Sequence, residues 1–509
     1  MEKIKTSLPW YKSDIVLLAG LAIFKVLLHL PVLTRYGYTL DELYFVACGK
    51  HLSFGYVDHA PLVPWIAWLS TALFGESLFA LRILATLSTA MTVFLVGLLV
   101  RRLGGSRFAQ IIACLGMIFA PVFLRTGNML CLPAFEPLFW VLASYMVVKI
   151  IKDNNPRLWP WVGFIIGFGL LNKHSMLFFG FGLVLGMTLT PMRKHFKSPW
   201  LYAGGGVALL MILPNLIWQI NHGWPTLSFI LNLRAGVMSG ISALQFLAGQ
   251  LLYLHPFNAI LWISGLVFFL FSKTGKSYRI LGWIWVFVFV LLLVTKSKIY
   301  YLAPAYAALF AGGGIALEKW ILRKSKKWLK PALISFLLIG GIILGPISVP
   351  YLDIDTTENY IHTITFSAFK NIYEVTGDLR GMFGWEKRVQ TVAHVFHSLS
   401  PEEQDRAVIW AFEYGNAGAI DYFGKKYGLP NAVSLSLSYW LWGVPKGKGD
   451  IVICVGIQKK DIEHIFDRVE VAAEVELEHV NPWHTPFLVL ICRSPIKPLP
   501  EIWEKNRPW

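Results

Sequence analysis

The stretch YTLDELYFVACGKHLSFGYVDHAPLVPW, residues 38–65, places the carboxylates Asp41, Glu42 and Asp58 among aromatic residues and between long apolar runs. The whole chain has 509 residues, of which 55% are hydrophobic and only 15% are charged, and its mean hydropathy is +0.55. Soluble domains carry about 25% charged residues. We therefore expect lipid to surround a large part of the chain, with residues 38–65 forming a polar loop at the membrane boundary.

A membrane-spanning helix needs about 20 mostly apolar residues. Eleven runs are candidates: 14–33, 78–100, 107–124, 133–150, 159–172, 175–190, 200–218, 243–270, 280–295, 299–317 and 332–350. The fifth and sixth are short, and 61–74 is a possible re-entrant or additional segment. The first run lacks a small-residue cleavage signature, so we interpret it as a retained helix and not as a removed signal peptide.

Basic residues indicate how these runs are oriented, because cytoplasmic loops of membrane proteins collect Lys and Arg. If the runs simply alternate, six basic segments fall on one side: Lys3, Lys5 and Lys12 at the N-terminus, and residues 101–107, 149–157, 191–197, 272–279 and 323–330. This predicts a cytoplasmic N-terminus and an external or periplasmic tail after residue 350. It also explains the net charge of +16 without nucleic acid, which we exclude as a partner.

Ionisable groups collect on the predicted outer side, and such groups at membrane depth are candidates for function. They are Asp41, Glu42, Asp58, His59, Glu136, Lys173, Arg234, Lys296 and Lys298, with Tyr38, Tyr300 and Tyr301 beside them. Apolar residues at helical spacing in 40–56 predict a helix lying flat at the outer interface and walling a cavity. In such a cavity, lysine and arginine would hold a phosphate, and a carboxylate would accept a proton from a hydroxyl or amine.

At this point the residues resemble a known family. The first outer loop, 38–69, is similar to that of bacterial membrane glycosyltransferases related to protein O-mannosyltransferases, of class GT-C and family 39, which include the lipid A aminoarabinose transferase. Further similar segments follow in order: LPAFEPLFW at 132–140, GLLNKHSMLFF at 169–179, LPNLIWQINHGWPTLSF at 213–229, GQLLYLHPF at 249–257, KSKIYYLAPAYAAL at 296–309, and YGNAGAIDYFGKKYGLP and SLSYWLWG in the tail. Each motif is weak alone, but their order makes the resemblance specific.

The resemblance implies a GT-C fold with about 11–13 transmembrane helices in a bacterial inner membrane. It implies a transferase that moves a sugar, with inversion, from a polyprenyl-phosphate donor to a lipid, glycan or protein on the outer face. The acidic residue that acts as base or orients the acceptor would be Asp41, with Glu42 beside it. The second acidic residue would be Glu136, where many relatives have Asp.

The resemblance also assigns substrate-binding positions. A phosphate-contacting lysine of the aminoarabinose transferase is replaced here by His59, next to Asp58. Phosphate binding would therefore depend on Lys173, Lys296, Lys298 or Arg234. Tyr300 and Tyr301 match tyrosines near the lipid phosphate, although the aromatic belt at a membrane interface also explains them. Tyr38 is placed in the same substrate site.

We expect no cofactor. Some GT-C enzymes use a divalent metal, but His51, His59 and Asp58 are too loosely spaced to indicate one, so an essential metal is not favoured. The five cysteines show neither a metal-ligand spacing nor a disulfide framework. Cys454 and Cys492 lie in two strand-like runs and could be neighbours.

The tail changes character after residue 350. Strand-like runs at 406–412, 450–456, 469–477 and 487–494 alternate with helical patterns such as 385–398 and 414–426. We therefore predict a membrane domain of residues 1–350, with the first outer loop at 34–77, and a soluble α/β domain of residues 351–509. A catalytic role for the tail alone is not expected, because no nucleophile–base pair stands out.

Two other functions compete with a transferase. A transporter or flippase of a polyprenyl-linked lipid would also use a charged outer cavity, but transporters often contain internal repeats, and none is found in the sequence. A structural or assembly protein whose tail binds partners would leave the polar group of Asp41, Glu136 and Lys173 unexplained.

Overall fold

The structure of the chain is a computed structural model that describes residues 13–235, 241–367, 371–445 and 449–509. The chain divides into two compact units. Unit 1 comprises Met1–Leu33, Arg82–Ile220 and Leu231–Tyr351, and unit 2 comprises Thr34–Leu81, Asn221–Ile230 and Leu352–Trp509. The first outer loop therefore belongs to the same unit as the C-terminal tail.

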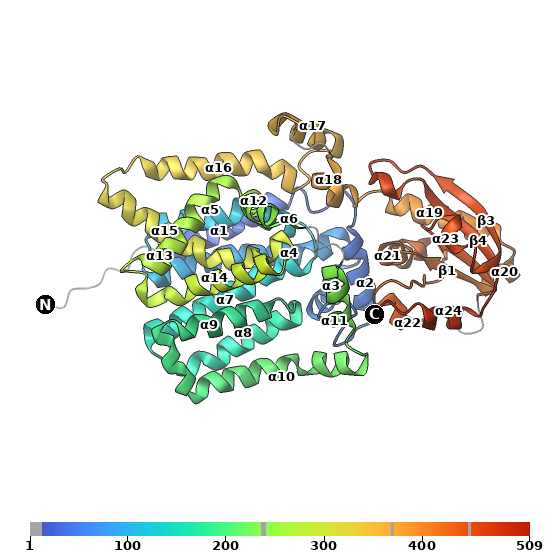
Figure 1. Ribbon diagram of the computed structural model, residues 1–509. Helices are drawn as coiled ribbons and strands as arrows, with labels where there is room; N and C mark the ends of the chain where they lie inside the picture. The colour runs from blue at the N-terminus through green and yellow to red at the C-terminus, as the bar shows by residue number, and fades with distance from the viewer. Residues whose placement is uncertain (1–12, 236–240, 368–370, 446–448) are drawn as a thin grey trace. The chain divides into compact units, whose positions relative to one another are not determined.

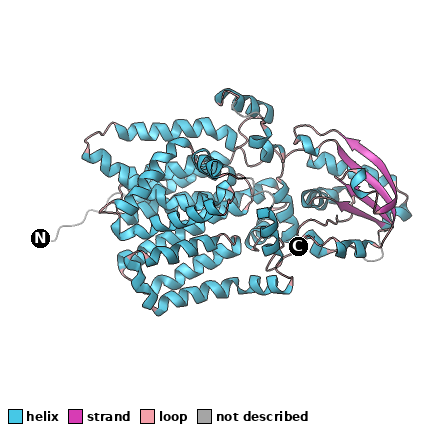
Figure 2. Ribbon diagram, in the orientation of Figure 1, coloured by secondary structure: helices cyan, strands magenta, loops and turns pink. Residues whose placement is uncertain are grey.

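Unit 1 is built from helices joined by short connections (Figures 1 and 2). Its α-helices are α1 (Asp14–His29), α4 (Leu78–Leu103), α5 (Arg107–Phe119), α6 (Pro121–Thr126), α7 (Leu132–Asp153), α8 (Trp159–Asn172), α9 (Met176–Thr188), α10 (Pro199–Asn221), α12 (Ala243–Leu254), α13 (Ala259–Phe271), α14 (Arg279–Val294), α15 (Tyr306–Arg323) and α16 (Leu329–Ser348). Short 3-10 helices connect them: η2 (Pro156–Leu158), η3 (Pro191–Lys197), η4 (Pro256–Asn258), η5 (Lys276–Tyr278) and η6 (Ile299–Ala305). Every apolar run in the predicted set forms a helix or a pair of helices.

Six helical segments of the described chain are long and apolar enough to cross a bilayer, and two bent pairs would raise the number to eight. The six are α4, α7, α10, η5 with α14, η6 with α15, and α16. The prediction of a polytopic helical membrane protein is confirmed, but fewer segments meet this criterion than the eleven predicted. One reason is visible at Pro121, where the preceding Ala120 leaves the helical region and separates α5 from α6.

The predicted span at 243–270 is not one straight helix. The chain bends by 98° between α12 and the helical segment that begins at Pro256. His255 has a positive φ of 82°, and its Nδ1 accepts a hydrogen bond from the Phe257 amide at 3.1 Å. Because a proline disfavours the helical conformation of the residue before it, Pro256 ends α12.

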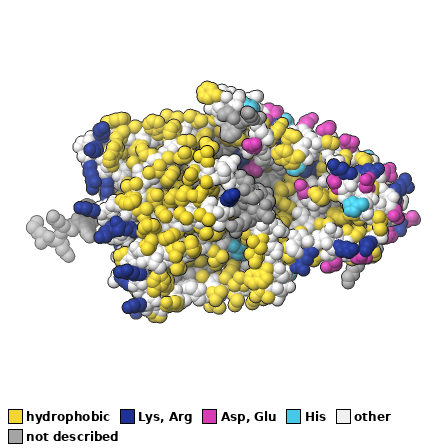
Figure 3. All heavy atoms as spheres, in the orientation of Figure 1, with side chains coloured by type: hydrophobic (Ala, Val, Ile, Leu, Met, Phe, Trp, Pro, Cys, Tyr) yellow, Lys and Arg dark blue, Asp and Glu magenta, His cyan; other side chains and the backbone are white. Residues whose placement is uncertain are grey.

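Basic side chains gather at one end of unit 1. Figure 3 shows Lys and Arg at the end where Figure 1 places the α9–α10 and α15–α16 connections. The first connection holds residues 191–197, and the second lies within 323–330; these are two of the predicted basic segments. The predicted N-terminal segment with Lys3, Lys5 and Lys12 lies outside the described residues. Clustering of these segments at one end is the arrangement that the positive-inside rule requires.

Unit 2 combines helices with one mixed sheet. Its strands are β1 (Ala407–Ala411), β2 (Ile451–Val455), β3 (Phe466–Val475) and β4 (Phe487–Pro495), in the spatial order β1-β2-β4-β3. Its helices are α2 (Leu40–Lys50), α3 (Leu62–Phe74), α17 (Ile354–Ile364), α18 (Tyr373–Arg380), α19 (Trp385–Ser398), α20 (Pro401–Arg406), α21 (Tyr414–Phe423), η7 (Gly424–Tyr427), α22 (Tyr439–Trp442), α23 (Lys459–Ile462), η8 (Pro482–His484) and α24 (Leu499–Lys505), with the first part of α11 (Pro225–Ala235). The predicted α/β tail is confirmed.

The sheet is buried on both faces at β1, β2 and most of β4, whereas the edge strand β3 is largely exposed. β1 and β2 are parallel, and the β2–β4 and β3–β4 pairs are antiparallel. Ile409 and Ile453 belong to one core cluster, while Val408 and Val452 belong to the other. Cys454 and Cys492 are the neighbours that the sequence suggested, with 3.5 Å between the sulfurs of two free, buried thiols.

The helix of the first outer loop is part of this core. Thr39 and Glu42 form a capping box that starts α2, and Leu43, Tyr44 and Cys48 are buried in the cluster that also contains residues of α19 and α21. The helix predicted within 40–56 forms over Leu40–Lys50, and residues of the tail bury its apolar positions. Its place flat at the membrane interface stays a prediction.

Replacing Leu43 by Ala tests this packing. Leu43 is 0% exposed, and removing a buried leucine side chain costs about 2–5 kcal/mol because it leaves a cavity. We expect Leu43→Ala to lower the thermal unfolding midpoint of unit 2 in detergent. Leu52→Ala is the control, because Leu52 in the same loop is 49% exposed. Equal effects of the two variants would contradict the shared core.

Candidate functional site

Seven of the predicted site residues with described side chains form two clusters, one in each unit. The unit 1 cluster contains Glu136, Lys173, Ser175, Tyr300 and Tyr301. Glu136 lies in the first turns of α7, Lys173 follows the last residue of α8, and Ser175 precedes α9. The two tyrosines lie on η6.

A side-chain contact holds the end of α8 against the start of α7. The Asn172 side-chain amide donates a hydrogen bond to the Leu132 carbonyl oxygen at 3.1 Å. This carbonyl lies in the first turn of α7, next to the turn that carries Glu136. The hydrogen bond therefore fixes the point where the chain leaves α8, and Lys173 is the next residue.

Glu136 and Lys173 form a largely buried ion pair. Lys173 Nζ lies 3.1 Å from Glu136 Oε2, and the two side chains are 15% and 3% exposed, respectively. The Ser175 hydroxyl donates a hydrogen bond to Glu136 Oε1. A buried carboxylate needs such partners, because an unpaired charge away from water is strongly unfavourable.

The ammonium of Lys173 also lies over aromatic rings. Its Nζ is 4.3 Å from the centre of the Tyr301 ring and 5.3 Å from that of Tyr300. An ammonium has three donors, and the hydrogen bond to Glu136 uses one of them. Chemically, this arrangement gives a fixed cation that can bind an anion such as a phosphate oxygen.

The remaining predicted cations of unit 1 are placed less completely. Lys296 is exposed and has a positive φ of 50°, and Lys298 is half-buried and directly precedes η6. Both lysines are therefore close in sequence to Tyr300 and Tyr301. Arg234 lies on α11, but its side chain is outside the described part of the structure.

The unit 2 cluster surrounds two aspartates. The Tyr414 hydroxyl donates a hydrogen bond to Asp41 Oδ1 at 2.9 Å, and the Tyr44 hydroxyl donates one to Asp58 Oδ1 at 2.8 Å. The two tyrosine rings lie 4.9 Å apart. His59 is buried, and its Nε2 lies 3.8 Å from Asp58 Oδ1. The structure thus brings Asp41, Asp58 and His59 together with two tyrosines.

Asp41 is the accessible carboxylate of this cluster. Its side chain is exposed to solvent, yet protein surrounds it closely enough that desolvation raises its pKa. The hydrogen bond from Tyr414 opposes this and lowers the pKa, and nearby Asp58 adds a smaller upward shift. An ionised, accessible carboxylate whose pKa is moved toward neutral pH is suited to accept a proton.

Two predicted residues of the same loop have clear structural contacts. Glu42 is fully buried, and its Oε2 accepts a hydrogen bond from the Thr39 amide at 2.8 Å in the capping box of α2. The hydroxyl of Tyr38 lies 2.7 Å from that of Tyr422, and the Tyr38 carbonyl accepts a hydrogen bond from the Trp385 indole. Both residues therefore help to hold the loop within unit 2.

Sequence reasoning did not assign Tyr44, Ser175, Tyr414 or Ser438. The Ser438 amide donates a hydrogen bond to the Tyr44 hydroxyl at 3.1 Å, next to Asp58. A signal existed for all four, because Tyr44 lies in 38–69, Ser175 in 169–179, and Tyr414 and Ser438 in the tail segments that resemble the family. The resemblance located these segments but could not show which of their residues contact the first loop.

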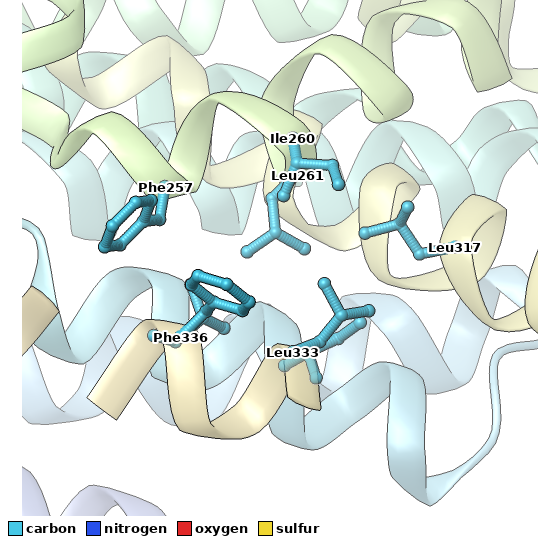
Figure 4. Close-up of a pocket in the computed structure, with 8 residues that line it drawn as sticks. Phe257, Ile260, Leu261, Leu317, Leu333 and Phe336 are labelled. Atoms are coloured by element: carbon cyan, nitrogen blue, oxygen red, sulfur yellow. The ribbon is translucent and has the colours of Figure 1, made fainter. Parts of the chain in front are cut away.

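An apolar pocket in unit 1 is separate from both clusters. Figure 4 shows side chains that line it, and all of them are hydrocarbon. They are Ile112, Phe257, Ile260, Leu261, Leu317, Leu333, Phe336 and Leu337, from α5, η4, α13, α15 and α16. This lining contains no side chain that could transfer a proton.

No group of three or more His, Cys, Asp or Glu side chains suited to a metal occurs within the described ranges. The sequence-based expectation that no metal is essential stays a prediction.

The sequence comparisons point to one class of enzyme. Residues 58–218 match the family described as dolichyl-phosphate-mannose-protein mannosyltransferase. The chain is 28% identical over 202 residues to undecaprenyl phosphate-alpha-4-amino-4-deoxy-L-arabinose arabinosyl transferase 1 of Pseudomonas fluorescens Pf-5, which is 38% of this chain and 36% of that protein. It is 31% identical over 205 residues to the corresponding transferase 1 of strain Pf0-1, covering 38% and 31%. The chain thus matches about a third of the length of these curated relatives.

The comparison of folds covers nearly the whole chain. The crystal structure of ArnT from Cupriavidus metallidurans in the apo state matches with a TM-score of 0.60 and 15% identity, over 94% of this chain and 97% of that chain. The structure of the same protein bound to undecaprenyl phosphate matches with a TM-score of 0.58 and 12% identity, over the same shares of the two chains.

These matches relate the chain to the GT-C membrane glycosyltransferases. The chain shares the fold of ArnT over nearly its whole length, and the resemblance stated from the sequence is confirmed.

A double-mutant cycle tests the Glu136–Lys173 pair. Lys173→Met would leave the Glu136 carboxylate buried and unpaired, and breaking one side of a buried pair costs about 3–5 kcal/mol. We expect a large fall in the thermal unfolding midpoint for Lys173→Met, and a smaller fall when Glu136→Gln is added to it.

The exposed pair Lys497–Glu501 serves as the control for this cycle. Lys497→Met, alone or with Glu501→Gln, is expected to leave the midpoint unchanged, because exposed ion pairs contribute little. Additive effects of Lys173→Met and Glu136→Gln would contradict the pairing.

Proposed function

We propose that the chain is a membrane glycosyltransferase that takes its sugar from a polyprenyl-phosphate donor. The observation that carries this proposal is the fold, which is shared over 94% of the chain with ArnT, a protein also solved bound to undecaprenyl phosphate. The match of residues 58–218 to a family of dolichyl-phosphate-mannose mannosyltransferases supports the same donor class. An anion-binding lysine and an accessible aspartate supply the chemistry that such a reaction needs.

The lysine cluster is assigned to the donor phosphate. In the reaction, the bond between the anomeric carbon and the phosphate oxygen breaks, and negative charge grows on the leaving lipid phosphate. A fixed cation aimed at that charge lowers the barrier. We assign this role to Lys173, oriented by Glu136 and by the ring of Tyr301. Lys296, Lys298 and Arg234 are the other cations proposed for the phosphate.

Asp41 is assigned to the acceptor. It accepts the proton of the attacking hydroxyl or amine while the new bond forms at the anomeric carbon. Attack on the face opposite the leaving phosphate inverts that carbon. The products are the glycosylated acceptor, the polyprenyl phosphate and a proton on Asp41. We propose a lipid, glycan or protein acceptor on the outer face of a bacterial inner membrane, and we assign no cofactor.

A transporter of a polyprenyl-linked lipid is the other function considered. None of the relatives described above is named a transporter. The two functions differ in what happens to the lipid, because a transferase consumes the donor and releases free polyprenyl phosphate, while a transporter moves the lipid unchanged. Release of polyprenyl phosphate from a labelled donor by the purified protein would therefore separate them.

Asp41→Asn tests the assigned base. The substitution keeps the size of the side chain but removes its ability to accept a proton near neutral pH. We expect loss of at least about a hundredfold in sugar transfer, since general base catalysis contributes about 10²–10⁴-fold. The rate is measured by transfer of a radiolabelled sugar from undecaprenyl phosphate to isolated envelope acceptors, and donor binding is expected to stay intact.

Asp461→Asn is the matched control, because Asp461 is an exposed aspartate on α23 of the same unit. It is expected to keep the wild-type rate. Full activity of Asp41→Asn would show that the base has been assigned wrongly, and wild-type protein that releases no polyprenyl phosphate would refute the transferase itself.

Sidedness is tested with introduced cysteines, since the five native cysteines are buried. Lys326 lies in the exposed basic connection between α15 and α16, and Asp461 lies in unit 2. We expect an impermeant maleimide to label Asp461→Cys in intact spheroplasts and to label Lys326→Cys only after permeabilisation. The reverse pattern would contradict an external C-terminal segment and a cytoplasmic basic end.

A further inference from the structure

The C-terminal segment contributes a tyrosine, Tyr414, that contacts the proposed base Asp41. Tyr414 is the first residue of α21, three residues after β1 ends at Ala411. Its hydroxyl donates a hydrogen bond to Asp41 Oδ1 at 2.9 Å, although the two residues are 373 positions apart in the chain. Because β1 lies in the sheet and α21 packs in the same core, the backbone at Tyr414 is held on a rigid support.

Two glycines explain how α21 comes close enough to α2 for this contact. A Cβ atom at Gly415 would collide with the Leu40 side chain, and one at Gly418 would lie 2.9 Å from the Leu43 carbonyl carbon. Glycine at these two positions, one helical turn apart, removes the side chains that would separate the helices. The first turn of α21 therefore reaches the first turn of α2, where Asp41 lies.

The second aspartate is held in a related way. Tyr44 donates a hydrogen bond to Asp58, and the Ser438 amide of the C-terminal segment donates one to the Tyr44 hydroxyl. The rings of Tyr44 and Tyr414 lie 4.9 Å apart at an angle of 52°. Asp41 and Asp58 therefore each accept a hydrogen bond from a tyrosine hydroxyl. Tyr414 belongs to the tail, and Tyr44 is bound by Ser438 of the tail.

We propose that Tyr414 is a positioning residue that orients the carboxylate of Asp41 and keeps it ionised, so that the C-terminal segment completes the acceptor-activating site. This inference rests on the proposed function of Asp41 as the base. A hydrogen bond from a neutral hydroxyl to a carboxylate is charge-assisted and stronger than one between neutral groups. It also leaves the second oxygen of Asp41 available to an acceptor.

The groups around Asp41 determine in which direction its pKa moves when Tyr414 is replaced. Desolvation, Asp58 and Asp378 raise its pKa, while Tyr414 and His59 lower it. Removing the Tyr414 hydroxyl takes away one downward contribution, so the Asp41 pKa rises. A smaller fraction of Asp41 is then ionised at a given pH, and the missing activity returns when the pH is raised above the new pKa.

The experiment compares the pH dependence of kcat for wild type and Tyr414→Phe. We expect kcat near neutral pH to fall about tenfold, because a hydrogen bond to a charged group changes an equilibrium by about that factor or more. The acidic limb of the profile should move to higher pH by about one unit. KM for the polyprenyl-phosphate donor is expected to stay unchanged.

Tyr439→Phe is the matched control. Tyr439 donates a hydrogen bond to the Asp421 carboxylate at 2.8 Å in the same unit, and burial raises the pKa of Asp421 to about 6. The control therefore removes the same kind of tyrosine–aspartate bond away from Asp41. It is expected to keep the wild-type pH profile of kcat, whatever its effect on the unfolding midpoint.

Three outcomes decide the matter. A Tyr414→Phe profile that coincides with wild type, or one lowered equally at every pH, overturns the positioning role while leaving the transferase intact. Full activity of Asp41→Asn would show that Asp41 is not the base, and it would overturn both the base assignment and the positioning role of Tyr414. If Tyr414→Phe does not fold, Tyr414→Asn tests the same loss with a side chain too short to reach Asp41, and the same shift of the acidic limb is required.

Discussion

A charged side chain that leaves water needs a partner, and the polar clusters of this chain are built around that cost. Glu136 is almost fully buried and meets Lys173 and Ser175. Lys25 is fully buried in α1, and its ammonium donates to the carbonyls of Ile118 and Phe123 on either side of the break between α5 and α6. In both places, helix ends and helix breaks supply the polar partners that an apolar bundle otherwise lacks.

Unit 2 meets the same requirement with hydroxyl groups in place of opposite charges. Asp41 and Asp58 are each bound by a tyrosine hydroxyl, and neither bond cancels the negative charge. Tyr414 comes from the tail, 373 positions from Asp41, and Ser438 of the tail binds the Tyr44 hydroxyl. The first outer loop therefore acquires this geometry only when the C-terminal segment folds against it. The shared core that contains Tyr44, Cys48 and Ile409 makes that assembly a packing event as well as a polar one.

The sequence predicts what local pattern controls and misses what depends on tertiary contact. Long apolar runs predict the helices, because lipid burial selects those residues directly. Strand-like runs predict the bounds of β1, β2 and β4 to within one residue, while β3 begins three residues earlier and ends two residues earlier than predicted. The bend at His255–Pro256 was missed, because a continuous apolar run does not indicate where the chain changes direction within it. Glu136 and Lys173 were both candidates, but their pairing follows from the packing of α7 against the end of α8. Tyr414 was not assigned at all, because nothing local marks a contact with Asp41.

The structure also separates the roles of the two acidic candidates named from the resemblance. A group that accepts a proton must be reachable by the acceptor. Glu136 is 3% exposed, and its two oxygens already bind Lys173 and Ser175. Asp41 is exposed, and its described hydrogen bond from Tyr414 engages one oxygen. The accessible carboxylate is therefore the better candidate for the base, and Glu136 is better suited to fixing the ammonium of Lys173 over the Tyr301 ring. In the proposed function, Asp41 therefore exchanges the proton, and Glu136 orients the lysine.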